Sequence, residues 1–458
     1  MKRDGAKLAN DTIRTFHYNT RSSSKLNGSR AISDTDRVET SDAIVDSTSP
    51  PASLRVTRRR KKISDDRRAS SVVLPIDTII EVFKRLPVKT LARFLCLSKL
   101  WASIIRSPNF KKLFLAVVAE SSNRPGSLLF YFPYSEGNFL LSSLQTQDPG
   151  EASVATYHMP NPAYKRTTNL TSVHGLICYE TACGSGLAVY NSSTRRSITL
   201  PKFEPGNFLI QHYLGYDPID HVFKVLCITG PMTASKIQLE MAQSKLVAQV
   251  LTLGSETSWK MIEVSHTHFP YSSQICVNGV VYYVARAGAE CKEVAYMSFD
   301  VRSEKFDLIE RPSDSVVQGS TLFRYEGKLA IVSREVPADG SIAMWVLEDA
   351  VKHEWSKKVF VLPNSWRRLA RGKRTSLHTF HRFVSVTDAG ELILAPTILC
   401  VPRPIYYVLY CDPERNRVRK VEIGGITEHN LKLLRCKKRN FCSVIPIFSS
   451  QGESLMFL

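Results

Sequence analysis

The 458-residue chain has no uninterrupted apolar run of about 18 residues, the length that a membrane-spanning helix needs. Its first twenty residues alternate basic, acidic and polar side chains around no apolar core, so they do not resemble a secretory signal. The ten cysteines include no Cys-x-x-Cys pair. In a chain without a secretory signal we expect cysteines to be reduced and mostly buried, and we expect no membrane partner.

Motifs of the common catalytic and metal sites are also missing. The chain contains no Gly-x-Ser-x-Gly elbow, no phosphate-binding glycine loop and no His-Glu-x-x-His. The pair His378 and His381 lacks a cysteine or carboxylate at zinc-ligand spacing. We therefore predict no catalytic residues, no metal and no cofactor. A Cys/His pair that only the fold brings together is the open alternative.

Acidic residues are few relative to basic ones, and the net charge of +19 favours acidic or phosphorylated partners or non-specific nucleic acid. Residues 1–70 contain few aromatics and no sustained periodicity, which predicts a disordered basic arm. Basic residues cluster in this arm at 58–62 and 67–68. A nuclear localisation signal and a solvated linker both explain that cluster. We expect the protein in the nucleus, the cytoplasm or both.

The stretch from Val72 to Val118 has helical periodicity. Apolar residues recur at i, i+3, i+4 and i+7 from Ile76 and, with Ser98 as the last position, from Leu91. Pro87 separates the two helices that this spacing predicts, and Thr90 is the expected cap of the second.

Two further short helices complete the stretch. One is expected around Trp101, and the other opens at Ser107-Pro108, which reads as an N-cap followed by a first-turn proline. A unit this small cannot bury all of its apolar residues, so we expect part of them to face a partner.

Two Leu-Pro steps and the run from Arg93 to Trp101 make this stretch similar to an F-box of large plant families. The resemblance implies that the unit docks onto a Skp-family adaptor, and through it onto a cullin scaffold. The candidate adaptor-binding residues, some of which are also expected in the core, are Leu74, Pro75, Ile79, Leu86, Pro87, Leu91, Leu97 and Trp101.

From residue 127 onward short aromatic and β-branched runs alternate with turn residues, which predicts an all-β region. Asn278-Gly279 between apolar strands is a strong type I′ hairpin signal. Turn markers recur at roughly 40 to 65 residues, within reach of the kelch-like blade period. Counting a hairpin at 127–144 and a closing strand near Cys442–Phe448, we expect a propeller of about six blades. A pair of β-sandwiches is the alternative.

Several short sequence motifs of this region resemble the F-box-associated domain of plant F-box proteins, among them Gly175–Cys178, Asn278–Tyr282 and Ser298–Phe306. The expected fold class is therefore α+β and multidomain, an all-α F-box unit before an all-β propeller-like domain. The expected domains are a disordered arm at 1–70, an F-box at 71–118 and the β-propeller-like domain at 127–450.

A basic segment in the β region could bind an acidic or phosphorylated substrate through bidentate guanidinium contacts, although a solvated charged loop is the favoured interpretation of the segment taken alone. Its residues are Arg367, Arg368, Arg371, Lys373 and Arg374. The resulting hypothesis is a non-catalytic substrate-recognition subunit of a Skp-cullin-F-box ubiquitin ligase. The alternatives are a basic propeller that scaffolds a complex or binds RNA without a ligase role, with nucleic acid the less favoured partner, and a propeller-based enzyme.

Overall fold

The structure is a computed structural model, and it describes a subset of the 458 residues. The described ranges are 74–120, 127–132, 138–144, 156–161, 170–181, 186–202, 207–231, 246–255, 257–288, 293–312, 314, 320–370, 381–387, 389–400, 406–423, 442–444, 446–448 and 452–456. The arm expected at 1–70, with its basic cluster, lies outside these ranges.

Four short helices form the first described part of the chain: α1 (Ile76–Phe83), α2 (Val88–Phe94), α3 (Lys99–Arg106) and α4 (Pro108–Glu120). Their apolar faces converge on one core that contains Phe83, Leu91 and Phe110. The Phe83 ring lies edge-on to that of Trp101, with the centroids 5.6 Å apart. The helical periodicity of the sequence is thereby confirmed for all four helices.

One expected cap is wrong and another is confirmed. Helix α2 begins at Val88 with Pro87 in the N-cap position, so Thr90 lies inside the helix and does not cap it. Proline fixes an extended conformation directly before the helix, which starts the helix earlier than the apolar spacing indicates. Ser107 precedes α4 as expected, and its hydroxyl accepts a hydrogen bond from the amide of Phe110 at 3.2 Å.

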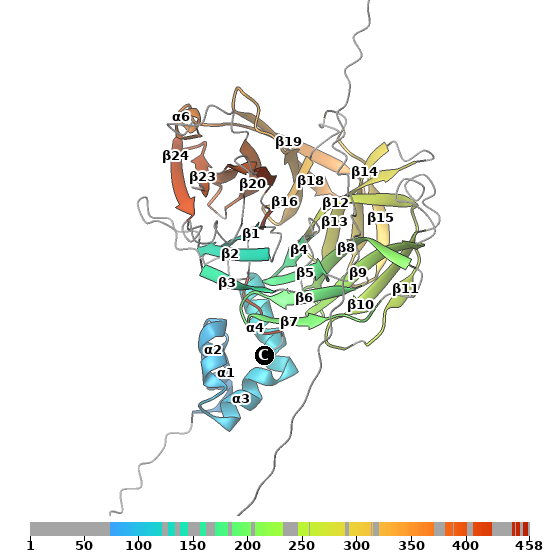
Figure 1. Ribbon diagram of the computed structural model, residues 1–458, viewed down its shortest axis with the longest axis vertical. Helices are drawn as coiled ribbons and strands as arrows, with labels where there is room; N and C mark the ends of the chain where they lie inside the picture. The colour runs from blue at the N-terminus through green and yellow to red at the C-terminus, as the bar shows by residue number, and fades with distance from the viewer. Residues whose placement is uncertain are drawn as a thin grey trace, which may run out of the picture. The chain divides into compact units, whose positions relative to one another are not determined.

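The all-β part contains six four-stranded antiparallel sheets within the described residues (Figure 1). Five of them use strands that follow one another in sequence: β4 (Leu170–Val173), β5 (Leu176–Glu180), β6 (Leu187–Asn191) and β7 (Arg196–Thr199); β8 (Asn207–Asp217), β9 (Val222–Pro231), β10 (Val247–Thr252) and β11 (Lys260–Ile262); β12 (His268–Val277), β13 (Val280–Ala287), β14 (Glu293–Asp300) and β15 (Lys305–Ile309); β16 (Ser320–Tyr325), β17 (Lys328–Ser333), β18 (Ser341–Asp349) and β19 (Glu354–Val361); β20 (His381–Val386), β21 (Leu392–Pro396), β23 (Tyr406–Asp412) and β24 (Arg417–Ile423).

The sixth sheet joins both ends of the β region. Its strands are β26 (Ile447–Phe448), β1 (Ser127–Phe132), β2 (Asn138–Leu144) and β3 (Thr156–Asn161), in that order. Strand β26 pairs with β1 through Phe448 opposite Leu129. The hairpin and the closing strand that the sequence predicts are thus confirmed. A separate two-stranded sheet pairs β22 (Ile398–Cys400) with β25 (Cys442–Val444).

Six apolar clusters between neighbouring sheets close the ring. Each of five consecutive pairs, from β1–β3 with β4–β7 to β16–β19 with β20–β24, shares one cluster of buried side chains. The last cluster packs Phe130 of β1 against Ile393 of β21 and Tyr406 of β23. The six sheets therefore follow one another around a closed circuit, which is the arrangement of a propeller and not of a sandwich pair.

Two kinds of tight turn connect the strands. At Asn278-Gly279 both φ angles are positive, 49° and 86°, which confirms the type I′ turn. The other kind starts with an Asp or Asn whose side-chain oxygen accepts a backbone amide two or three residues on, and its fifth residue is left-handed. The first residues of these turns are Asn191, Asp217, Asp300, Asp349 and Asp412.

Candidate functional site

The helical unit divides the predicted adaptor residues between core and surface. Ile79 and Leu91 are buried, with 8% and 0% of their surface exposed, and they belong to the core of the four helices. Leu86 and Trp101 pack against that core while keeping part of their surface exposed. Their place in or against the core accounts for the structural half of the shared role expected for them, and their part in binding an adaptor stays a prediction.

The other predicted residues lie on the surface. Leu74 and Leu97 expose 52% and 68% of their surface, and Pro75 and Pro87 are exposed as well. Leu97 sits in the turn between α2 and α3. These leucines leave apolar surface in contact with water, and burying it against a partner would be favourable.

Four more exposed apolar residues of the same unit escaped the sequence reasoning. They share an exposure of 45–52% and are Ile76, Val82, Leu100 and Leu113. The sequence of α1, which contains Ile76 and Val82, indicates that some of its apolar residues face outward, because they cover more of the helix circumference than one buried stripe requires. Periodicity alone does not tell which apolar residues of such a helix face outward.

The predicted basic segment is described only in its first part. Arg367 and Arg368 lie exposed on the short helix α6 (Trp366–Ala370), between β19 and β20. The Arg367 guanidinium donates a hydrogen bond to the carbonyl of Ala338, whereas Arg368 has no hydrogen bond or ion pair within the described residues. Arg371, Lys373 and Arg374 lie outside the described residues.

Buried neighbours fix α6 in place. Trp366 and Ala370 are buried in the apolar cluster between the last two sheets. The Tyr407 hydroxyl donates a hydrogen bond to the Ala370 carbonyl at 3.0 Å. Since its proton is used there, the Tyr407 oxygen accepts from Nε2–H of His381, also at 3.0 Å. These contacts fix the position of α6, and with it the position of the backbone that carries Arg367 and Arg368.

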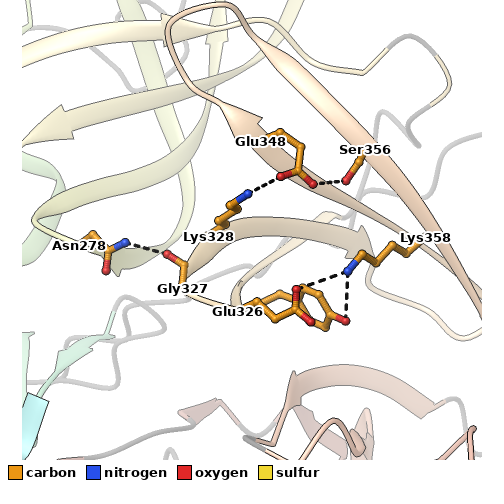
Figure 2. A network of polar contacts seen from close by, with 8 residues as sticks. Asn278, Glu326, Gly327, Lys328, Glu348, Ser356 and Lys358 are labelled. Atoms are coloured by element: carbon orange, nitrogen blue, oxygen red, sulfur yellow. Dashed lines mark hydrogen bonds and ion pairs between the residues drawn. The ribbon is translucent and has the colours of Figure 1, made fainter. Parts of the chain in front are cut away.

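Several lysines elsewhere on the propeller are paired with carboxylates. Figure 2 shows Lys328 bound to Glu348 and Lys358 bound to Glu326, the latter at 3.4 Å. The same view shows the Asn278 amide donating to the Gly327 carbonyl at 2.8 Å, which joins the turns of two neighbouring sheets. These exposed pairs contribute little stability, but they reduce the positive charge of this surface.

Helix α6 and the turns at 326–327 and 350–353 lie at opposite ends of the strands. In the sheet β16–β19 the first and third hairpins turn at one end, at 326–327 and 350–353, whereas the connection between β17 and β18 lies at the opposite end. Because neighbouring strands are antiparallel, the connection from β19 to β20 also leaves from this opposite end. Helix α6 therefore lies at the end that carries the β17–β18 connection, where Arg367 contacts Ala338, and opposite the turns at 326–327 and 350–353.

Buried histidines of the propeller have structural partners. The Nε2 of His212 lies 3.2 Å from the Cys178 carbonyl, and His268 bonds the Tyr283 hydroxyl at 2.6 Å. The described residues contain no group of three His, Cys, Asp or Glu side chains placed to hold a metal ion. Among the described helices, none combines the length and apolarity that crossing a membrane requires.

Comparison with known proteins assigns both parts of the chain. A family model described as the F-box domain matches residues 73–113, and one described as the F-box associated beta propeller domain matches residues 127–447. Three Arabidopsis thaliana proteins are similar over most of their lengths. At4g38870 is 42% identical, covering 88% of this chain and 91% of its own length. F-box protein At2g21930 is 40% identical, covering 87% and 98%.

The third relative, F-box protein DOR, is 37% identical and covers 77% of this chain and 88% of its own length. The matched ranges coincide with the helical unit and the ring of sheets that the structure shows. This chain belongs to the plant F-box proteins, with an F-box domain followed by an F-box-associated β-propeller domain.

Proposed function

We propose that the chain is the non-catalytic substrate-recognition subunit of a Skp-cullin-F-box ubiquitin ligase. Its helical unit binds a Skp-family adaptor, and its propeller holds a protein substrate. The supporting observation is the set of exposed apolar residues on a unit of four short helices, with Leu97 the most exposed at 68%. Binding an adaptor removes this surface from water, and the chain contributes by raising the effective concentration of the substrate at the ligase.

An adaptor titration of the full chain tests this function. Leu97→Asp should weaken adaptor binding by about tenfold or more, because it places a charge at a desolvated contact. Val351→Asp is the matched control, since Val351 exposes 88% of its surface on the turn between β18 and β19. Isothermal titration calorimetry gives both affinities. Absence of binding by the unchanged chain, or equal affinity of both variants, would contradict the proposal.

For the substrate surface we propose the propeller end that carries α6. Arg368 offers an exposed guanidinium without a partner in the described residues, beside Arg367 on an anchored helix. Guanidinium groups bind carboxylates and phosphates in a bidentate way, which suits an acidic or phosphorylated segment. Proximity labelling with the proteasome inhibited compares the unchanged chain with Arg367→Glu/Arg368→Glu. An unchanged set of labelled proteins would count against this surface.

A further inference from the structure

Residues 452–456 lie between the helical unit and the sheet β4–β7, outside both ranges that the family models match. Two of their side chains contact the helices. The carboxylate of Glu453 accepts a hydrogen bond from the backbone amide of Val88 at 2.9 Å, where α2 begins. Leu455 exposes 2% of its surface and is part of the core of the four helices.

The alternate residues contact the propeller. The backbone amide of Ser454 donates to the Ser193 hydroxyl at 3.3 Å, and Met456 packs on the apolar cluster of β4–β7 and β8–β11. Successive side chains of an extended segment point to opposite sides. The side chains of Glu453 and Leu455 thus contact the helices, whereas the Met456 side chain and the Ser454 backbone contact the propeller, so the segment joins both domains.

Two glycines allow residues 452–456 to approach the β4–β5 turn and α4 closely. A Cβ atom at Gly175, in the turn between β4 and β5, would overlap the carbonyl oxygen of Gly452. A Cβ atom at Gly452 would lie 3.1 Å from Val118 of α4 and 3.5 Å from the His174 ring. Helix α4 adds a direct contact, because Leu115 belongs to the apolar cluster of β4–β7 and β8–β11. The helices and the sheet therefore meet closely around the segment.

Asn191 distinguishes this sheet from the others. Like the aspartates that begin four other turns, it accepts turn amides with its side-chain oxygen, here from Ser193 at 2.8 Å and Thr194 at 3.2 Å. Unlike them, it has an amide nitrogen, which donates to the carbonyls of Ser454 at 2.9 Å and Met456 at 2.7 Å. Aspartate could close the turn but could not donate these two hydrogen bonds.

We infer that Asn191 and residues 452–456 are positioning elements that hold the F-box in one orientation on the propeller. This inference rests on the proposed ligase role, because a fixed orientation sets the distance between the adaptor and a captured substrate. Asn191 is fully buried and Ser454 exposes 1% of its surface, so water cannot replace the lost hydrogen bonds without opening the contact. The segment binds the end of the sheet β4–β7 that carries its first and third turns, at Gly175 and Asn191, whereas α6 lies at the end of the sheet β16–β19 opposite its first and third turns.

Asn191→Asp isolates this function. The variant keeps the oxygen that closes the turn and places a carboxylate against two carbonyl oxygens of the segment. Hydrogen exchange of the full chain should become about tenfold faster at the start of α2, where Glu453 binds the Val88 amide. The matched control is Asp300→Asn, which makes the reverse change in the turn between β14 and β15. The control should leave exchange in α2 unchanged.

A second variant ends the chain after residue 451. Small-angle X-ray scattering should show a larger radius and a broader distance distribution, a change that a loss of stability within a folded domain would not produce. Circular dichroism checks that helices and sheets persist in the truncated chain. If the helices are lost, the inference is tested by hydrogen exchange in Asn191→Asp alone. Unchanged α2 exchange in Asn191→Asp overturns the inference, as does an unchanged scattering curve of a folded truncation. Failure of the unchanged chain to bind adaptor refutes the ligase role alone, since exchange and scattering need no adaptor.

Discussion

The backbone amide of Val88 and the carboxylate of Glu453 are hydrogen bonded at 2.9 Å although 365 positions separate them in the sequence. Val88 is the first residue of α2, and the N-cap residue Pro87 has no side-chain oxygen for the free amides of the first turn. A residue from the far end of the chain therefore takes over part of the capping that a Ser, Thr or Asp would provide locally.

Glu453→Ala should destabilise the F-box by about 1 kcal/mol, the usual effect of losing a capping hydrogen bond. Glu453→Gln is the control, because its amide oxygen can still accept the Val88 amide. The free energy of unfolding of both variants is measured by urea unfolding, with hydrogen exchange in α2 as the signal. Equal loss in the two would show that charge, and not the hydrogen bond, carries the effect.

Gly215→Ala should destabilise the propeller by about 1–3 kcal/mol, the range for overpacking a core. A Cβ atom there would lie 2.5 Å from one methyl of Val301 and 2.9 Å from a methyl of Val281, in the next sheet. Gly186→Ala is the control, since its nearest atom, the Thr181 hydroxyl oxygen, would be 3.6 Å away. Thermal unfolding compares them, and an equal melting temperature of both variants would contradict tight packing at Gly215.

Trp355→Phe should lower stability by about 0.5–1 kcal/mol, because the indole N–H donates to the Glu310 carbonyl at 2.9 Å and phenylalanine has no donor. Trp259 makes the same kind of bond to the Pro201 carbonyl, also at 2.9 Å, between an earlier pair of sheets. The two hydrogen bonds share no residue, so the stability losses of Trp259→Phe and Trp355→Phe should add in the variant that carries both substitutions. Denaturant unfolding of both single variants and the double variant measures this, and a double loss smaller than either single one would refute independence.

Acid should destabilise the propeller through His212. Burial lowers the pKa of His212 to about 4 from its usual 6.5, against the opposing effect of its hydrogen bond to the Cys178 carbonyl. Between these values the unfolded chain binds more protons, so stability falls as the pH drops from about 6.5 to 4, by up to roughly 3 kcal/mol. Burial also lowers the pKa of His268, which acts in the same direction.

His212→Gln removes the titrating ring and keeps an N–H that can reach the Cys178 carbonyl, so its stability should depend less on pH than that of the unchanged chain. His353→Asn is the control, in the turn between β18 and β19, where asparagine tolerates the positive φ of 56°. Urea midpoints from pH 7 to pH 4.5 give the comparison. Parallel pH curves for His212→Gln and the unchanged chain would rule out His212 as the cause.

Local patterns in the sequence determined much of this protein. The spacing of apolar residues from Ile76 onward predicts the helices, and Asn278-Gly279 predicts its turn, because both depend on contacts within a few residues. Regular turn spacing, together with the closing strand near Phe448, predicts six sheets. The local prediction fails at Thr90, which does not cap α2, because Pro87 directly before Val88 starts the helix earlier.

Only the tertiary structure decided how the parts are joined. In sequence, Asn191 looks like any residue that opens a turn, and residues 452–456 carry no periodic pattern long enough to read. Their hydrogen bonds span 263 and 265 positions, and no rule of spacing predicts which amide meets which carbonyl across such a distance. Likewise, Ile79 and Ile76 belong to one apolar helix, and only packing against the other helices buries the first and exposes the second.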